Sequence, residues 1–185
     1  MYEVEVKVEL SEKERQDLIA LFKKKGFESK GVTPQSDFYT EAKPSVYGGY
    51  DLKRYRHEAD KFIYTEKIWE MADDAKARKE NEYEVTQEKM EAEIAQNPVV
   101  VKIIKDREWF KGTYQGSEIS ITIDSVKFDH SPNIRYFIEA EIDVTDKNTV
   151  KDTKRKIVDF LRELLGKKDS MIEAPGMFTM AMDKK

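Results

Sequence analysis

The sequence predicts an α+β fold in which short antiparallel strands outnumber the helices. Alternating apolar and charged residues, typical of strands with one buried face, recur along most of the chain. Helical patterns are fewer, and each follows an acidic strand and a hydroxyl residue that can cap the first helical turn. No low-complexity linker interrupts the 185 residues, so we expect a single domain over residues 1–185.

The first such unit begins with YEVEVKVEL at residues 2–10. Its charged face carries Glu3, Glu5 and Lys7 in alternate positions, which places the two carboxylates only about 6–7 Å apart. Ser11 and Glu14 then form a capping-box pattern, and Gly26 is expected to end the helix. The simplest explanation of the charged face is an edge strand exposed to water.

The unit recurs in NEYEVTQEKMEAEIAQNP at residues 81–98 and in the segment that starts with FIEAEIDV at residue 137. In both, carboxylates alternate with other residues and therefore share one face of a strand. The acidic residues on these faces are Glu82, Glu84, Glu139, Glu141 and Asp143.

Other strand-like segments carry basic pairs in the same alternating positions. An open antiparallel sheet would expose these charges to water, whereas a closed barrel would turn them inward. Each strand carries mostly one sign of charge, which favours the barrel over an ordinary solvated face. A lumen with both signs would need water, metal ions and a polyanion to offset the desolvation of its charges. The basic residues are Arg54, Arg56, Lys67, Lys105 and Arg107.

Composition excludes several classes of protein. With 33 Lys and Arg against 37 Asp and Glu, the net charge of −4 gives no basic surface for duplex nucleic acid or a membrane. Cys is absent and only His57 and His130 are present, so a metal site would use oxygen ligands. No apolar run suits a signal peptide or a membrane span, and we expect a cytoplasmic protein.

The order of these motifs resembles the CYTH superfamily of triphosphate tunnel metalloenzymes, which includes class IV adenylyl cyclases, thiamine triphosphatases and inorganic tripolyphosphatases. The E-x-E-x-K segment at residues 3–7 is similar to the family's first strand. The segments LKRYR, IYTEK, ENEYEV, IKDREW, ITID and YFIEAEI then follow in the order of the family's later strands. The resemblance implies a closed eight-stranded antiparallel barrel, a tunnel, with flanking helices and with charged side chains in its lumen.

The resemblance also implies roles for the charged residues. Two divalent cations, Mg²⁺ or Mn²⁺, would be held by Glu3, Glu5, Asp124, Glu139 and Glu141. Further acidic groups in the lumen would be Glu82 and Glu84. A triphosphate would be bound by Lys7, Arg54, Arg56, Lys67, Lys105 and Arg107. Catalysis would depend on Glu5, Glu139 and Lys7, with either glutamate or a metal-bound hydroxide as the base.

Three functions follow from this resemblance. We expect metal-dependent hydrolysis of a linear triphosphate, either inorganic tripolyphosphate or a nucleoside triphosphate. The alternatives are a class IV adenylyl cyclase and a non-catalytic binder of polyphosphate or nucleotides. Hydrolysis is preferred because no loop offers an arrangement of polar groups that would recognise adenine. The expected partner is the small-molecule substrate, and a homodimer is left open.

Several residues receive simpler interpretations. Arg78 and Lys79 are expected to be solvated charges of a hairpin insertion over residues 71–79. Trp69 and Trp109 are expected to be packing residues. Relatives commonly carry a Tyr on a short plug helix near the C-terminus, and Phe178 is the nearest residue here, so a role that needs the hydroxyl would be lost. The methionines around it are expected to fill gaps in the core.

Overall fold

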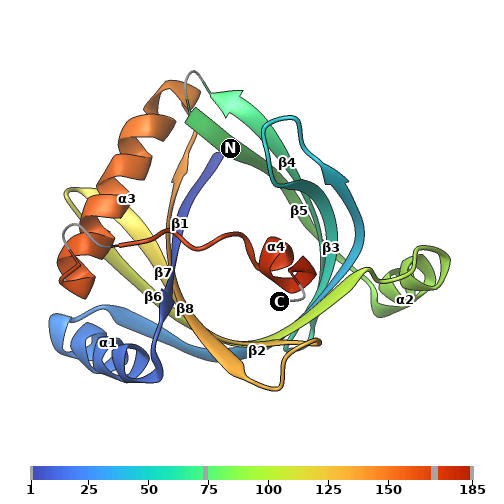
Figure 1. Ribbon diagram of the computed structural model, residues 1–185, viewed down its shortest axis with the longest axis horizontal. Helices are drawn as coiled ribbons and strands as arrows, with labels where there is room; N and C mark the ends of the chain where they lie inside the picture. The colour runs from blue at the N-terminus through green and yellow to red at the C-terminus, as the bar shows by residue number, and fades with distance from the viewer. Residues whose placement is uncertain (1, 73–74, 168–170, 184–185) are drawn as a thin grey trace.

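The computed structural model of the protein describes residues 2–72, 75–167 and 171–183. Figure 1 shows the strands closing into a ring, with α1, α2 and α3 outside it and α4 in its opening. Around the barrel wall the strand order is β1–β5–β4–β3–β2–β6–β7–β8, and all neighbours pair antiparallel. The closed eight-stranded barrel with flanking helices is therefore confirmed.

The strands are β1 (Tyr2–Leu10), β2 (Glu28–Pro44), β3 (Tyr50–Glu58), β4 (Lys61–Ala72), β5 (Ala75–Val85), β6 (Val101–Tyr114), β7 (Ser117–Phe128) and β8 (Ile134–Val144). The helices are α1 (Glu12–Lys25), α2 (Gln87–Gln96), α3 (Val150–Leu165) and α4 (Met177–Met182), with a 3-10 turn at Lys147–Thr149 before α3. None of the helices within the described ranges has the length and hydrophobicity needed to span a bilayer.

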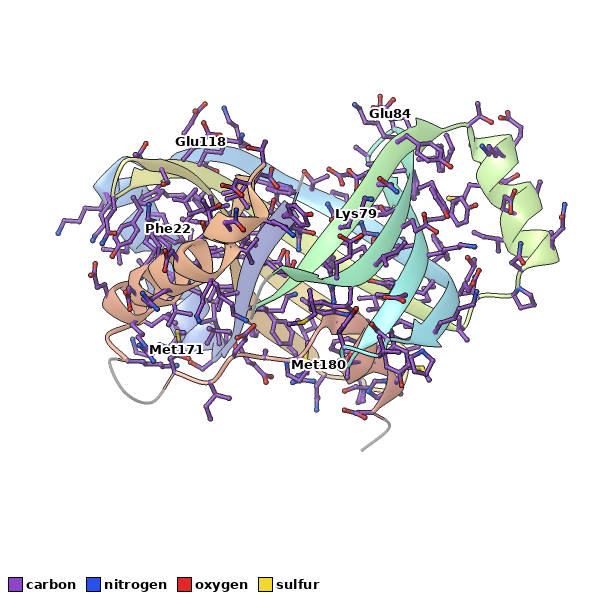
Figure 2. All side chains as sticks on the ribbon, turned by 90° about the horizontal axis from the view of Figure 1, so that it is seen from above. Phe22, Lys79, Glu84, Glu118, Met171 and Met180 are labelled. Carbon is purple, nitrogen blue, oxygen red and sulfur yellow. The ribbon has the colours of Figure 1, made fainter. Side chains whose placement is uncertain are left out.

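The larger apolar core lies outside the barrel wall, between the strands and the helices α1 and α3. Val4, Val6 and Val8 of β1 are buried in this core. Phe22 of α1, labelled in Figure 2, packs on Phe110 of β6 with ring centroids 4.9 Å apart. Each such buried side chain contributes about 1.5–3 kcal/mol. Because the apolar residues of β1 point outward, its alternating charged residues point into the barrel.

The helix ends follow the predicted local signals. The Ser11 hydroxyl accepts a hydrogen bond from the Glu14 backbone N–H at 3.2 Å, and the Glu14 carboxylate accepts one from the Ser11 backbone N–H at 2.7 Å. Gly26 ends α1 with φ 77°, a left-handed conformation that glycine adopts readily. The capping box and the helix end at Gly26 are confirmed, and together they direct the chain from β1 across the outside of the barrel.

One end of the barrel is closed by residues 171–183, which we call the tail segment. Figure 1 shows this segment crossing the barrel opening from the side of α3 to α4. The Ala174 backbone N–H donates to the Lys7 carbonyl at 2.8 Å. The Phe178 ring packs 5.2 Å from Tyr39 and 5.1 Å from Tyr50, between centroids. A second, smaller apolar core thus lies inside the barrel mouth, and it includes the buried Met177 and Met180, which pack as expected.

Candidate active site in the barrel lumen

A cavity of about 400 Å³ lies inside the barrel, beside the tail segment. Its lining is dominated by charged side chains of both signs. The basic residues that line it are Lys7, Arg54, Arg56, Lys67, Arg78, Lys105 and Arg107. The acidic residues that line it are Glu3, Glu5, Glu80, Glu82, Glu139, Glu141 and Asp143. The cavity therefore brings together all six residues predicted to bind a triphosphate, as well as Glu3, Glu5, Glu139 and Glu141.

Carboxylates gather where β1 pairs with β8. Glu5 lies directly opposite Glu141 in the register of the two strands, and Glu3 lies opposite Asp143. We call Glu3, Glu5, Glu141 and Asp143 the acidic cluster. Side chains directly opposite on one face of an antiparallel pair have Cβ atoms about 4.5–5.5 Å apart, so like charges there repel.

This repulsion contributes to a raised pKa of Glu141. Burial raises the pKa of Glu141, and the neighbouring carboxylates of Glu3, Glu139 and Glu5 raise it further, to about 9. At neutral pH Glu141 therefore holds a proton that it would release to a cation. Lys67 and Arg78 contact Glu3 and Glu5, whereas burial and its acidic neighbours keep Glu141 protonated.

Glu139 differs from the acidic cluster because cations surround it. Its carboxylate is 2.6 Å from the Lys7 ammonium and 3.4 Å from the Arg107 guanidinium. Burial alone would raise the pKa of Glu139, but Lys7 and Arg107 hold it well below its ordinary value. Asp124 is fully buried and accepts two hydrogen bonds of 2.7 Å from Arg107. Asp124 is thus the carboxylate that orients Arg107, and it is not among the residues that line the cavity.

Opposite the acidic cluster, a basic cluster of Arg54, Arg56 and Lys105 surrounds a single carboxylate. Asp37 of β2 accepts hydrogen bonds of 2.6 and 3.2 Å from Arg56. Its Oδ2 also lies 3.2 Å from Lys105 Nζ and 3.8 Å from Arg54 Nη1. Although burial raises the pKa of Asp37, these three cations hold it well below its ordinary value. Asp37 is therefore the anion that keeps the basic cluster together.

Lys105 is the least well compensated cation of the basic cluster. Burial lowers the pKa of Lys105, and the positive charge of Arg107 lowers it further, to about 7. The contact with Asp37 only partly opposes this shift. An anion that enters the cavity would favour the charged form of Lys105.

Lys67 connects the two clusters. Its ammonium lies 3.0 Å from Glu3 and 2.8 Å from Glu80, and both carboxylates raise the pKa of Lys67 in spite of burial. Glu80 is also 3.8 Å from Arg54. Because Glu80 holds two of the cations, it is part of the cavity's charge network.

The two acidic residues predicted on β5 lie in different environments. Glu82 lines the cavity and contacts Thr65 at 3.0 Å and Arg54 at 3.5 Å. Glu84 has a side chain that is 66% exposed and is paired with Lys61 at 2.6 Å. Figure 2 shows Glu84 at the end of the barrel opposite Met180. Glu84 lies beyond the cavity because β5 extends past it towards α2.

Sequence reasoning did not assign Asp37, Glu80, Asp143 or Arg78 to the site. For Glu80 and Asp143 a signal was available, because each lies two residues from a predicted lumen residue and hence on the same strand face. Asp37 lies two residues from Tyr39 and so on the same face of β2, and the Tyr39 ring packs against Phe178 of the tail segment. Arg78 alternates with Glu80 and Glu82 on the same face of β5, but the charged stretch around it was interpreted as a solvated hairpin.

The donor chemistry of the acidic cluster fits a hard divalent cation. Mg²⁺ and Mn²⁺ prefer carboxylate oxygens and water, and the acidic cluster offers several carboxylates, among them Glu141, whose pKa its acidic neighbours raise. Within the described residues, no three acidic or imidazole side chains already converge as a complete metal site. Mg²⁺ commonly uses only one or two carboxylates together with water and substrate phosphates, so a partial set of protein ligands suits it.

Comparison with solved structures finds the same fold in other proteins. The PH1819 protein of Pyrococcus horikoshii OT3 has a TM-score of 0.69 and 20% identity, with 100% of both chains covered. A Hippeastrum adenylyl cyclase candidate described as having a dominant triphosphatase activity has a TM-score of 0.63 and 16% identity, covering 98% of this chain and 95% of that one. The RNA triphosphatase Pct1 of Schizosaccharomyces pombe has a TM-score of 0.51 and 15% identity, covering 89% and 75%.

These structures share the fold at low identity, and no curated protein sequence matches the chain. The family model of the CYTH domain, however, matches residues 1–174, which include every strand of the barrel and the charged side chains of its cavity. The chain belongs to the CYTH domain family.

Proposed function

We propose that this protein hydrolyses linear triphosphates with the help of a divalent metal ion. The proposal rests on one observation: one cavity inside the barrel is lined by an acidic cluster on β1 and β8 and by a basic cluster on β3 and β6. A polyphosphate needs both, because cations must bind its oxygens and metal ions must neutralise the remaining charge. A site for a neutral ligand would need neither cluster.

The basic cluster would hold the phosphate chain. Arg54 and Arg56 present planar guanidinium groups, which bind phosphate oxygens in pairs, and Lys105 gains its full charge when an anion is bound. These side chains are buried, so their attraction for an anion is screened less than it would be at the surface. They fix the chain in one orientation and so supply much of the catalytic alignment.

The acidic cluster would hold the cation, with Glu3, Glu5 and Glu141 as its ligands. Bound Mg²⁺ or Mn²⁺ supplies charge neutralisation and a water of lowered pKa. Of the two predicted bases, Glu139 is engaged by Lys7 and Arg107, and its pKa is lowered. Glu5 has longer contacts, 3.4 Å to Arg78 and 3.9 Å to Lys7. Glu5 is therefore the better placed to accept a proton or to bind the cation, while Glu139 positions Lys7.

Hydrolysis is favoured over cyclisation by the uncharged part of the cavity lining. Cyclisation of ATP requires the nucleoside to be held in a fixed position, which demands hydrogen-bond donors and acceptors for the base. Among the described residues, the uncharged lining carries no Asn, Gln, Ser or His side chain, and its polar side-chain groups are the hydroxyls of Tyr39, Tyr50 and Thr179 and the indole N–H of Trp109. It consists of Tyr39, Tyr50, Leu52, Trp109, Gly176, Met177, Phe178 and Thr179. A site that recognises only phosphate and metal accepts tripolyphosphate at least as well as ATP.

The test is incubation of purified protein with tripolyphosphate or ATP, with Mg²⁺ or Mn²⁺, followed by chromatography of the products. We expect orthophosphate from tripolyphosphate, and none in the presence of EDTA. Cyclic AMP with equimolar pyrophosphate from ATP, and no orthophosphate from tripolyphosphate, would instead assign a cyclase. Metal-independent binding with no turnover would assign a binding protein.

Two matched variants connect the activity to the acidic cluster. Glu5→Gln and Glu141→Gln should each remove metal-dependent turnover while the circular dichroism spectrum stays unchanged. Glu118→Gln is the control, because Glu118 lies on β7 with a side chain that is 75% exposed and contacts only Lys111 among the described residues. Full activity in both cluster variants would contradict the metal assignment.

A further inference from the structure

Arg78 is a cation of the cavity that the family motifs did not identify. It lies on β5 directly opposite Trp69 of β4, and it lines the cavity. Its side chain is 14% exposed, so the expectation of a solvated hairpin charge is wrong for this residue. Lys79, the next residue, is 52% exposed and points to the outer face, as expected.

Contacts from three directions hold the Arg78 guanidinium in place. Its central carbon lies 4.5 Å from the Trp69 ring centroid, a distance typical of cation–π stacking. Its Nη1 lies 3.4 Å from a Glu5 oxygen. On another side the guanidinium lies close to Gly176 of the tail segment. A Cβ atom at position 176 would be only 3.4 Å from Nη2 of Arg78. Arg78 is therefore positioned at the end of the cavity that the tail segment closes.

Arg78 has donors left over, as Arg54 of the basic cluster does, whereas Arg56 and Arg107 are each held by a paired aspartate. Arg56 and Arg107 each donate two hydrogen bonds to an aspartate, with distances of 2.6 to 3.2 Å. Arg78 makes one long contact with Glu5, and its Nε is buried without a hydrogen-bond partner among the described residues. A guanidinium carries five N–H donors, and unsatisfied buried donors are costly. An anion in the cavity would satisfy those that face it.

We propose that Arg78 binds substrate directly, as a phosphate ligand at the end of the cavity closed by the tail segment, and that Trp69 is its positioning residue. This rests on the proposed function, because it takes the ligand to be a linear triphosphate. Stacking on Trp69 occupies the face of the guanidinium and leaves its donors at the edge, where the one hydrogen bond, to Glu5, is 3.4 Å long. Donors in this arrangement match phosphate oxygens in pairs. The 3.4 Å contact of Arg78 with Glu5 places this phosphate next to the acidic cluster.

The competing explanation is that Arg78 only neutralises Glu5. The two roles predict different effects of losing Arg78 when the acidic cluster is saturated with Mg²⁺, because the cation then neutralises Glu5. Loss of a neutralising arginine would have little effect under that condition. Loss of a phosphate ligand would still weaken binding.

The experiment is isothermal titration of the protein with a methylene-bridged, non-hydrolysable tripolyphosphate at saturating Mg²⁺. We expect Arg78→Gln to weaken binding about ten-fold or more, the usual scale for a lost charge-assisted hydrogen bond. Lys79→Gln makes the same charge change on the neighbouring outward position and should change affinity less than two-fold. Wild-type protein that binds no analogue would overturn both this proposal and the proposed function. Equal affinities for Arg78→Gln and Lys79→Gln would overturn this proposal alone.

Three further variants cover the case in which Arg78→Gln does not fold. Arg78→Lys keeps the charge but loses the planar group, and it should weaken binding several-fold because an ammonium cannot replace paired donors. Trp69→Leu should weaken binding while Trp69→Phe restores most of it, because only an aromatic ring supports the stacking. If Arg78→Lys binds like the wild type, or if Leu and Phe at position 69 behave alike, the assigned roles are wrong.

Discussion

Asp37 and Arg56 form a buried pair in which Asp37 accepts hydrogen bonds from both Nε and Nη2 of the guanidinium, at 2.6 and 3.2 Å. The same carboxylate contacts Lys105 at 3.2 Å. Asp37 is 1% exposed, so water contributes little to balancing these charges. The basic cluster is therefore assembled before any substrate binds, around a carboxylate whose pKa the surrounding cations hold well below its ordinary value.

Replacement of Asp37 by Asn should strongly destabilise the protein. The change leaves buried cations without their shared anion, and breaking a buried charge pair typically costs about 3–5 kcal/mol. We expect this loss in the free energy of unfolding measured with urea. Added tripolyphosphate should restore part of it, because phosphate oxygens would take over the role of the carboxylate.

The control is Glu41→Gln, since Glu41 lies on the same strand with a side chain that is 34% exposed and contacts Lys43 and Lys53. Exposed pairs of this kind contribute at most about 1 kcal/mol. Equal stability of the Asp37→Asn and Glu41→Gln proteins would contradict the central role of Asp37.

Lys105 should make triphosphate binding depend on pH. Burial, and then the charge of Arg107, lower its pKa to about 7, so Lys105 is mostly neutral at pH 8.5 in the free protein. A bound anion favours the ammonium and raises this pKa, so binding takes up a proton and weakens as pH rises above 7. Titrations at pH 8.5 in buffers of different ionisation enthalpy measure this proton uptake.

The variant Lys105→Met should abolish that uptake and flatten the pH dependence of binding between pH 7 and pH 9. Lys102→Met is the matched control, because Lys102 also lies on β6 but is not part of the cavity lining. Unchanged proton uptake in Lys105→Met would show that another group titrates in the site.

Glu141 should lower the stability of the metal-free protein at alkaline pH. Its pKa is raised from 4.5 to about 9, so the folded state keeps a proton that the unfolded state loses above pH 4.5. The unfolded state then binds fewer protons, and stability falls as pH rises from about 5 towards 9. Thermal unfolding in EDTA at pH 6 and pH 9 measures the effect.

The variant Glu141→Gln removes the titrating group and should be more stable than the wild type at pH 9, by an amount on the order of 1–3 kcal/mol. The two proteins should differ much less at pH 6. A difference that does not change with pH would mean that repulsion within the acidic cluster is not its cause.

The sequence predicts the barrel and much of the cavity lining because both follow from a local pattern. Alternation assigns Glu3, Glu5 and Lys7 to one face of β1, and burial of its valines against α1 and α3 decides which face is inside. Alternation does not predict how far along a strand the cavity extends. Glu82 and Glu84 share a face, yet only Glu82 lines the cavity.

Alternation along single strands does not predict contacts between segments that lie far apart in the sequence. Arg78 is buried because Trp69, Glu5 and Gly176 meet around it, and Gly176 belongs to a tail segment with no strand or long helix of its own. Asp124 illustrates the same limit, because alternation places it on a strand face but does not reveal that Arg107 engages both of its oxygens.

Glu80 and Glu84 provide a final comparison on one strand. Glu80 contacts Lys67 at 2.8 Å and Arg54 at 3.8 Å, and its side chain is 19% exposed. Replacement by Gln removes one negative charge from the cavity and releases two cations. We therefore expect Glu80→Gln to lower the free energy of unfolding by about 1–3 kcal/mol and to strengthen tripolyphosphate binding in EDTA.

Glu84→Gln makes the same chemical change where the side chain is 66% exposed and paired only with Lys61 among the described residues. It should change stability by no more than about 1 kcal/mol and leave tripolyphosphate affinity unchanged. Urea unfolding and calorimetric titration of both variants measure these effects. If Glu84→Gln alters binding as much as Glu80→Gln, the acidic part of the site extends further along β5 than the cavity does, and Glu84 would rejoin the lumen residues that the family resemblance implied.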